Sequence, residues 1–254
     1  SGGQLTLRDY AALSATSAID VNYATLQLEN SGASSMSALG DRLRDSAPLT
    51  LRGAMFTLVG RDNANVAEVV DNMTLGAGLN LFTINNGGFG IRSTELRIGT
   101  LTVQNDATLY FTGAGGQMGS NSRMTFANGT SMLVNGILPF ATNATDLASY
   151  DAQYGIAALN AAGFRGYDAT VVPAVGSATQ NLRLASGSFT ISDVGGVGTA
   201  GTYTANAIAF AASATGQTLG FADNADTLNL TAGALAVSGN FTRVIGGTVG
   251  NGRL

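Results

Sequence analysis

Four acidic residues recur at a nearly constant distance ahead of regularly spaced apolar residues. Each acid precedes its apolar residue by six or seven positions. The pairs, with spacings of six, six, seven and six, are Asp20 and Leu26, Asp45 and Leu51, Glu68 and Leu75, and Glu95 and Leu101. If the chain coils with this period, the four carboxylates form one column on successive coils. Clustered acids of this kind can bind calcium or act on polysaccharides.

Stacked carboxylates only ~5 Å apart repel one another unless they are splayed into solvent, neutralised or bridged by a cation. Arg44, Arg92 and Arg97 lie near the acids in the sequence and can neutralise them. We therefore expect a solvated or arginine-paired turn. The sequence predicts no catalytic residue, no cofactor and no metal ligand, with a calcium ladder on the column Asp20, Asp45, Glu68 and Glu95 left as an alternative.

A glycine-rich string, GVGTAG at 196–201, satisfies the G-x-G-x-x-G pattern of dinucleotide-binding loops through Gly196, Gly198 and Gly201, and Asp223 follows about twenty residues later. The context argues against that chemistry. Four residues separate the strand-like SFTI from the first matching glycine, and no repeating βαβ pattern surrounds it. We expect a coil corner here.

Five Asn-x-Ser/Thr triplets are formal glycosylation acceptors, at Asn72, Asn128, Asn143, Asn229 and Asn240. In a chain this rich in Asn and Thr, we expect most of these asparagines to turn corners or form amide ladders. Seven aromatic residues occupy strand-like positions and are expected inside the fold: Phe56, Phe82, Tyr110, Phe111, Phe126, Phe189 and Phe241.

The composition excludes several classes of chemistry. The 254 residues contain no Cys, His or Trp, and the cationic residues are all Arg. No disulfide, thiolate nucleophile, zinc cluster or His-based triad can be built from them. Charged residues make up 11% and the net charge is −4, without a basic stripe, which argues against nucleic-acid binding. The most apolar run, 205–214, is far shorter than the ~18 residues that span a bilayer, so we expect no membrane insertion.

The elements that must position these residues are short strands. DSAPLTLRGAMFTLVG at 45–60 alternates apolar and polar residues on both sides of Gly53, which indicates two half-buried strands joined by a bend. The same pattern predicts strands over 5–7, 24–28, 49–52, 55–59, 72–75, 79–84, 96–103, 107–111, 123–126, 131–134, 181–184, 188–191, 217–221, 226–230, 234–237 and 241–245.

The spacing of the strands favours a solenoid over a sandwich. Intervals of 25, 24, 26 and 25 separate Leu26, Leu51, Leu75, Leu101 and Phe126, and Leu184, Phe210 and Leu230 form a looser series. Stacked repeats have such periods. The predicted fold is all-β, a parallel β-helix with ~25 residues per coil and about nine or ten coils.

One segment interrupts the pattern. Over 137–172 the alternation lapses, and Asp146, Leu147, Tyr150, Tyr154, Ile156 and Leu159 fall closer to helical spacing. We expect coils over 1–136, an inserted loop or short helix over 137–172 that protrudes or covers a coil edge, and coils again over 173–254 of a single elongated domain. Its aromatics Tyr150, Tyr154, Phe164 and Tyr167 are candidates for a contact surface.

The stretch 24–78 resembles the autotransporter-associated β-strand repeat of large bacterial surface proteins. The matching residues are Leu39-Gly40-Asp41, Asp45-Ser46-Ala47-Pro48 and Leu49-Thr50-Leu51 with Gly53; 93–113 and 233–252 are similar but less specific. The resemblance implies a right-handed, single-stranded parallel β-helix in a secreted, surface-displayed protein, although we expect no C-terminal outer-membrane barrel in this sequence.

We therefore expect a fragment of a longer secreted chain with a non-catalytic role, a structural segment of an extracellular fibre or adhesin at the cell surface. Expected partners are further copies of itself, surface glycans or a neighbouring cell. A polysaccharide-degrading β-helix enzyme and a glycan-binding module are the alternatives, and the enzyme requires at least two acids and an Arg converging in a groove.

Overall fold

The computed structural model describes residues 2–31, 40–62, 64–86, 93–104, 106–113, 121–143, 146–185, 187–211, 216–238 and 240–246. Within these residues the chain is all-β, as predicted, and contains no α-helix. The strands are β1 (Gln4–Leu7), β2 (Ile19–Asn22), β3 (Thr25–Glu29), β4 (Leu49–Arg52), β5 (Met55–Val59), β6 (Val66–Asn85), β7 (Thr94–Val103), β8 (Ala107–Gly113), β9 (Ser122–Phe126), β10 (Ala141–Asn143), β11 (Asp146–Asp151), β12 (Gly155–Ala158), β13 (Ser177–Leu184), β14 (Ser188–Ile191), β15 (Thr202–Phe210), β16 (Gln217–Phe221), β17 (Thr227–Val237) and β18 (Arg243–Ile245).

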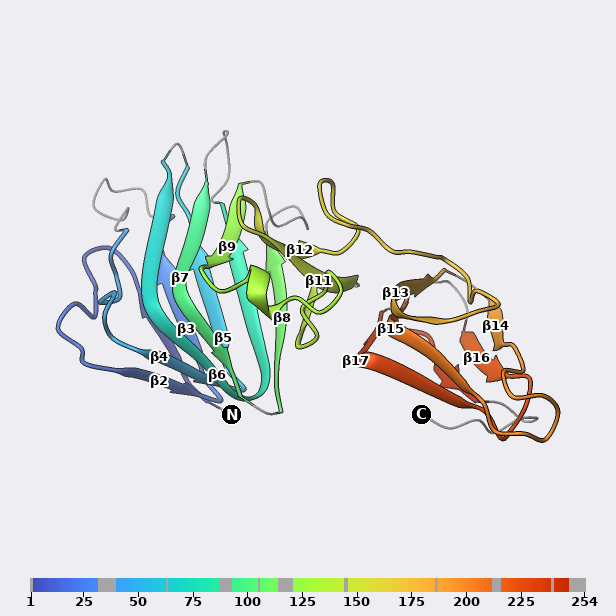
Figure 1. Cartoon of the computed structure of the whole chain (residues 1–254). Helices are drawn as coiled ribbons and strands as arrows, with labels where there is room; N and C mark the ends of the chain where they lie inside the picture. Colours follow the sequence, from blue (N-terminus) through green and yellow to red (C-terminus); the bar gives the residue numbers. More distant parts are fainter. Residues whose placement is uncertain are drawn as a thin grey trace. The chain divides into compact units, whose positions relative to one another are not determined.

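The strands stack as parallel coils of a β-solenoid, which confirms the predicted fold class. The solenoid has about seven turns, fewer than the nine or ten coils that were predicted. The chain forms two compact units (Figure 1). Unit 1 comprises Ser1–Leu133, Phe140–Ala144 and Ala148–Phe164, and unit 2 comprises Val134–Pro139, Thr145–Leu147 and Arg165–Leu254.

Unit 1 has two parallel ladders of strands. One contains β1, β3, β5, the second half of β6, β8 and β10, in that order. The other contains β2, β4, the first half of β6, β7 and β9. The predicted division of 45–60 into two faces is confirmed, because β4 belongs to one ladder and β5 to the other.

The core of unit 1 consists of columns of identical or similar inward side chains. Phe56 pairs with Phe82, and Phe82 pairs with Phe111 on the next coil. All three are buried, and the rings of the first two lie 5.4 Å apart between centroids. In-register parallel strands place paired side chains on the same side, so each coil continues the core of the one before it.

The corner between the two ladders is built from residues with left-handed backbone. Gly53, which was predicted to make this bend, has φ +54°, and a Cβ there would lie 2.7 Å from the ring of Tyr23 on the neighbouring coil. Backbone bonds continue through the corner, since Tyr23 N–H donates to the Arg52 carbonyl and Gly53 N–H donates to the Ala77 carbonyl, both at 2.9 Å. The corner therefore interrupts neither the ladder nor the core.

The predicted column of apolar residues is only partly correct. Leu51 does pair with Leu75. However, Leu26 belongs to the other ladder and pairs with Phe56, Leu101 pairs with Met73, and Phe126 pairs with Ile98. The reason is that the coils differ in length, from 21 residues between Leu5 and Leu26 to 32 between Leu109 and Ala141. In unit 2, Leu184 pairs with Phe210 as predicted, but Phe210 pairs with Val237 and not with Leu230.

The segment 137–172 contains strands where helical spacing suggested a short helix. β10 continues the β8 ladder, and β11 and β12 form an antiparallel hairpin. The Tyr150 hydroxyl accepts from the Phe126 N–H at 3.1 Å and donates to the Phe126 carbonyl at 2.7 Å, so it satisfies both backbone groups at the end of β9. The hairpin thus covers the last coil of unit 1, which was one of the two roles expected for this segment.

Unit 2 repeats the design with two three-stranded parallel sheets, β13-β15-β17 and β14-β16-β18. Their inward side chains form one core that includes Leu182, Leu184, Ile208 and Phe210. Two predictions from the sequence were wrong. The predicted strand 131–134 overlaps the 3₁₀ turn η3 (Thr130–Met132) and is not a strand. Strand β15 was not predicted, because its alanines obscure the alternation of apolar and polar residues.

We predict that Phe82→Ala lowers the free energy of unfolding by about 3–5 kcal/mol, because it leaves a cavity in the middle of an aromatic column. Met55→Ala on the outer face of β5 is the matched control and should change it by less than about 1 kcal/mol. Urea denaturation followed by circular dichroism measures both. Equal losses for the two variants would contradict the assigned core.

Candidate functional site

The four acids of the predicted column do not stack. Asp20 pairs with Thr50, Glu68 pairs with Leu96, and Glu95 pairs with Ala67 and Arg123. Asp45 precedes β4 in an exposed turn, where its carbonyl accepts from the Asp71 N–H. An offset of one residue moves a side chain to the opposite face of a strand, so unequal coils break the column. The premise of a calcium ladder on these four residues is therefore wrong.

Glu68 points into the molecule and is fully buried. Its carboxylate accepts from the backbone N–H groups of Arg42 at 3.1 Å and Leu43 at 2.7 Å. Burial raises the pKa of Glu68 to about 7, and the charges of Asp41 and Asp45 add to the increase, while the two backbone bonds oppose it. Glu68 thus anchors the segment before β4 to the neighbouring coil.

Arg42 is the second buried charge of this cluster. Its guanidinium donates to the carbonyls of Ala11 and Glu29 and to the Asn30 side chain, at 2.8–2.9 Å. Burial lowers the pKa of Arg42, and the nearby charge of Glu68 opposes that effect. The cluster ties two loops to the coil, which is a structural role that sequence reasoning did not find.

The other two acids of the predicted column are paired with arginine, as expected. Asp20 forms a surface ion pair with Arg52 on the next coil. Glu95 contacts Arg97 at 2.7 Å and lies 3.9 Å from Arg123. Of the other predicted neutralising residues, Arg44 donates to Ser46, and Arg92 lies outside the described residues.

The structure places a different set of acids together. A shallow depression of about 330 Å³ is lined by Asp41, Asp45, Asp71 and Arg44, with Ser14 and Ser46. All six residues are exposed. Asp71 was not singled out in the sequence, because its place beside Asp45 depends on the register between coils. Across the described residues, no group of three or more acids is arranged to hold a metal ion.

The GVGTAG loop forms the coil corner that was predicted, between β14 and β15, and its backbone amides are already occupied. Gly196 N–H donates to Asp193, Gly198 N–H to Asp223, and Gly201 N–H to Asp226 at 2.9 Å. A dinucleotide loop must offer such N–H groups to a pyrophosphate. Here carboxylates of the same chain take them, including the one from Asp223 that would mimic the ribose-binding acid.

The asparagines of the five triplets differ in exposure. Asn72, Asn229 and Asn240 are exposed, whereas Asn143 is buried. The Asn128 amide donates to the Leu101 carbonyl at 2.8 Å and accepts from the Leu101 N–H at 3.0 Å, so it bridges two coils. The expected amide ladder occurs elsewhere, where Asn206 donates to Asn181 on the adjacent coil at 2.8 Å.

The aromatic residues also divide by position. Phe56, Phe82, Phe111 and Phe126 are in the core as predicted, and Phe189 packs against it, but Tyr110 is partly exposed and Phe241 is 47% exposed. Of the predicted contact surface over 137–172, Tyr150 is buried, and the Tyr167 hydroxyl binds Asp146 and the Leu147 N–H. Tyr154 is exposed, and Phe164 and Tyr167 are each partly exposed.

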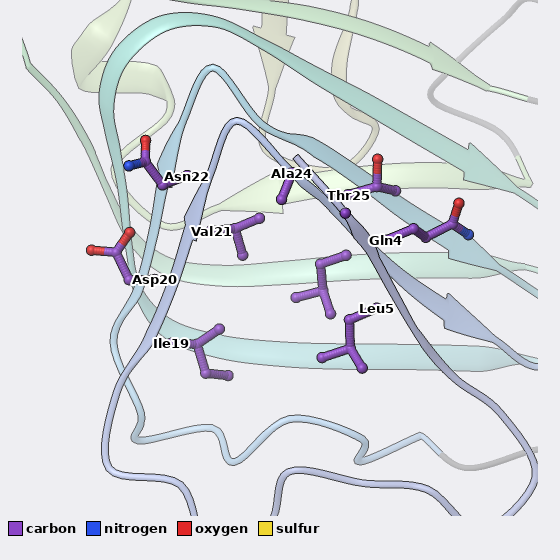
Figure 2. Close-up of a pocket in the computed structure, with 10 residues that line it drawn as sticks. Gln4, Leu5, Ile19, Asp20, Val21, Asn22, Ala24 and Thr25 are labelled. Atoms are coloured by element: carbon purple, nitrogen blue, oxygen red, sulfur yellow. The ribbon is translucent and has the colours of Figure 1, made fainter. Parts of the chain in front are cut away.

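A second hollow lies at the end of the first coil in unit 1. It measures about 470 Å³ and is lined by residues of β1, β2 and β3. In Figure 2, Leu5, Ile19 and Val21 point into this hollow, whereas Asp20 and Asn22 point away from it. Leu5 pairs with the buried Leu26, so it is a core position that is 50% exposed.

Comparisons with known proteins gave no relatives: no family model, no curated protein and no solved structure matches this chain. The autotransporter-like resemblance therefore remains a prediction. Within the described residues, no helix has the length and apolar character required to cross a bilayer.

We predict that stability falls by about 3 kcal/mol between pH 5 and pH 8. The unfolded chain releases the Glu68 proton near its ordinary pKa of 4.5, whereas the native protein retains it to about 7, so raising the pH between these values favours unfolding. Urea titrations across this range measure the slope. Glu68→Gln should flatten it, and Asp20→Asn controls for the loss of one surface carboxylate. An unchanged slope in Glu68→Gln would refute this assignment.

Proposed function

We propose that the chain is a non-catalytic structural segment of a bacterial surface fibre or adhesin, which acts through stiff solenoid stacking and self-association. The observation that carries the proposal is the regularity of the ladders. Parallel strands repeat over successive coils in each unit, with apolar columns inside. Since each coil is bound to its neighbours by backbone hydrogen bonds, such a stack resists bending and proteolysis.

The outer faces support an interfacial role. Thr57, Thr83 and Thr112 form one outward column, in which the last two hydroxyls lie 3.4 Å apart. Thr50 and Thr74 pair on the other ladder. A neutral hydroxyl surface with only 11% charged residues suits contact with neighbouring copies, surface glycans or another cell. The same composition, with a net charge of −4, supports an extracellular location and argues against nucleic-acid partners.

We predict that antibodies raised against the purified chain label the outer surface of intact producing cells, and that protease treatment of those cells removes the label. Immunogold electron microscopy before and after treatment measures this, with a cytosolic protein as the control for lysis. Label that appears only after the cells are broken would contradict the proposed location.

The second candidate is a carbohydrate-active protein, and the Asp41, Asp45, Asp71 and Arg44 depression favours it. This set meets the requirement for at least two acids and an Arg that converge. All of these side chains are exposed, however, whereas a general acid normally needs burial or a close like charge to raise its pKa.

We therefore predict that the purified chain releases no reducing ends from a panel of bacterial and plant polysaccharides. Turnover that Asp45→Asn or Asp71→Asn abolishes would establish the enzymatic alternative. Binding of a glycan without turnover, lost on Tyr154→Ala, would instead favour a glycan-binding module.

A further inference from the structure

The segment before β4 is attached to the preceding coil by its backbone and by one buried arginine. Residues 40–46, which we name the latch segment, form no strand, and Leu43 makes an isolated parallel bridge to Leu13. Leu13 N–H donates to the Arg42 carbonyl at 2.6 Å. The Arg42 guanidinium reinforces this attachment, because it donates to two backbone carbonyls of the preceding coil. These contacts fix the latch segment to the coil before it.

Toward the following coil, a carboxylate takes the place of a strand ladder. The latch segment lies close to β6, since a Cβ on Gly40 would lie 2.9 Å from the Ala67 carbonyl oxygen. The next residue of β6, Glu68, accepts from the N–H groups of Arg42 and Leu43. In a ladder, the carbonyls of the neighbouring strand would bind such groups. The closed position of the latch segment on β6 therefore depends on the Glu68 side chain.

The surroundings of this carboxylate are unfavourable to its charge. Glu68 is fully buried, and burial penalises the ionised form of a carboxyl group. The charges of Asp41 and Asp45, both in the latch segment, also oppose its ionisation. The positive charge of Arg42 and the two backbone N–H groups act in the opposite direction. Because both acids and Arg42 belong to the latch segment, moving this segment changes the whole environment of Glu68.

Further charged residues lie on the elements around the latch segment: Arg44 within it, Asp71 on β6, Glu95 and Arg97 on β7, and Asp9 and Glu29 on the preceding coil. Arg44 and Asp71 are exposed. On β7 the partner of Glu68 is Leu96, so the charged residues on either side of Leu96 lie on the opposite face of the strand. Asp9 and Glu29 act on the charge of Arg42.

We propose that the latch segment is a pH-sensitive element of unit 1, which Glu68 holds closed on β6 when it is protonated and releases when it is ionised. Release breaks the two bonds to Glu68 and the bond from Asp71 N–H to the Asp45 carbonyl. It gives the carboxylate access to water and moves the charges of the latch segment away. The ladders of unit 1 stay paired, because the latch segment belongs to none of them.

Release also takes apart the acidic depression of unit 1. Four of its six lining residues belong to the latch segment: Asp41, Arg44, Asp45 and Ser46. The pH therefore controls whether these side chains are held beside Asp71 on β6. The latch is a property of unit 1 and does not depend on the proposed function.

Native-state hydrogen exchange of the purified chain, corrected for the intrinsic exchange rates, tests the latch. Burial holds the pKa of Glu68 at about 7 in the closed segment, whereas the exposed carboxyl has its ordinary pKa of 4.5. The opening constant at the Arg42 and Leu43 amides should therefore rise about tenfold per pH unit between pH 5 and pH 7, and level off above pH 7.

Low concentrations of urea distinguish release of the latch segment from unfolding of the whole unit. Release exposes little surface, so urea should leave the opening constant at Arg42 and Leu43 nearly unchanged. The Leu81 amide, which donates to the Ala54 carbonyl inside a ladder, is the reference. Its opening constant should be smaller at every pH and should rise steeply with urea.

Variants test whether Glu68 is the group responsible. Glu68→Gln should remove the pH dependence at both amides. The double variant Asp41→Asn with Asp45→Asn keeps Glu68 and should level off at a lower pH, because two charges that raise the pKa of Glu68 are gone. Asp20→Asn, which removes a surface carboxylate from β2, is the control and should behave like the wild type.

The proposal is overturned if the opening constant at Arg42 and Leu43 is the same at pH 5 and pH 7, or if these amides follow Leu81 in both size and urea dependence. It is also overturned if Glu68→Gln keeps the wild-type pH dependence. Where Glu68→Gln does not fold, an unshifted pH profile in the double variant overturns it.

Discussion

The fold depends on one constraint, which is that each strand must hydrogen-bond to the strand one coil away while its inward side chains meet those above and below. The coils are ~4.8 Å apart, so a side chain has room only for one of similar shape on its neighbours. The column Phe56, Phe82 and Phe111 satisfies this, as do Leu51 and Leu75. The unequal lengths of the coils are accommodated in the turns and loops and by register shifts within the β4–β6, β13–β15 and β15–β17 pairings.

The buried polar residues occur where the ladder cannot satisfy the backbone. Asn80 follows the corner in β6 and donates to the carbonyls of Ala77, Gly78 and Thr108. In the loops before β4, Glu68 accepts from the backbone N–H groups of Arg42 and Leu43, and Arg42 donates to backbone carbonyls. An unpaired buried backbone group costs about as much as a lost hydrogen bond, which explains why a chain with few charges still buries these two.

Features that depend on residues close together in the sequence could be predicted from it. Features that depend on how one coil pairs with the next could not. Alternation around Gly53 placed β4 and β5 correctly, because a strand's faces follow a period of two. Register depends on coil lengths, so the column of acids was wrong, and Glu68 proved to be inside. The aspartates that occupy the GVGTAG amides come partly from the next coil, so no local pattern could reveal that the loop binds its own chain.

The central claim is that successive coils pair in the assigned parallel register, and the absence of cysteine allows a direct test. Thr57, Thr83 and Thr112 occupy one outward column on three consecutive coils. With Cys introduced at 57 and 83, a short thiol cross-linker should join the pair in the folded monomer. With Cys at 57 and 112, two coils apart, it should not. Equal cross-linking of both pairs, or cross-linking of the second pair alone, would contradict the register and the solenoid built on it.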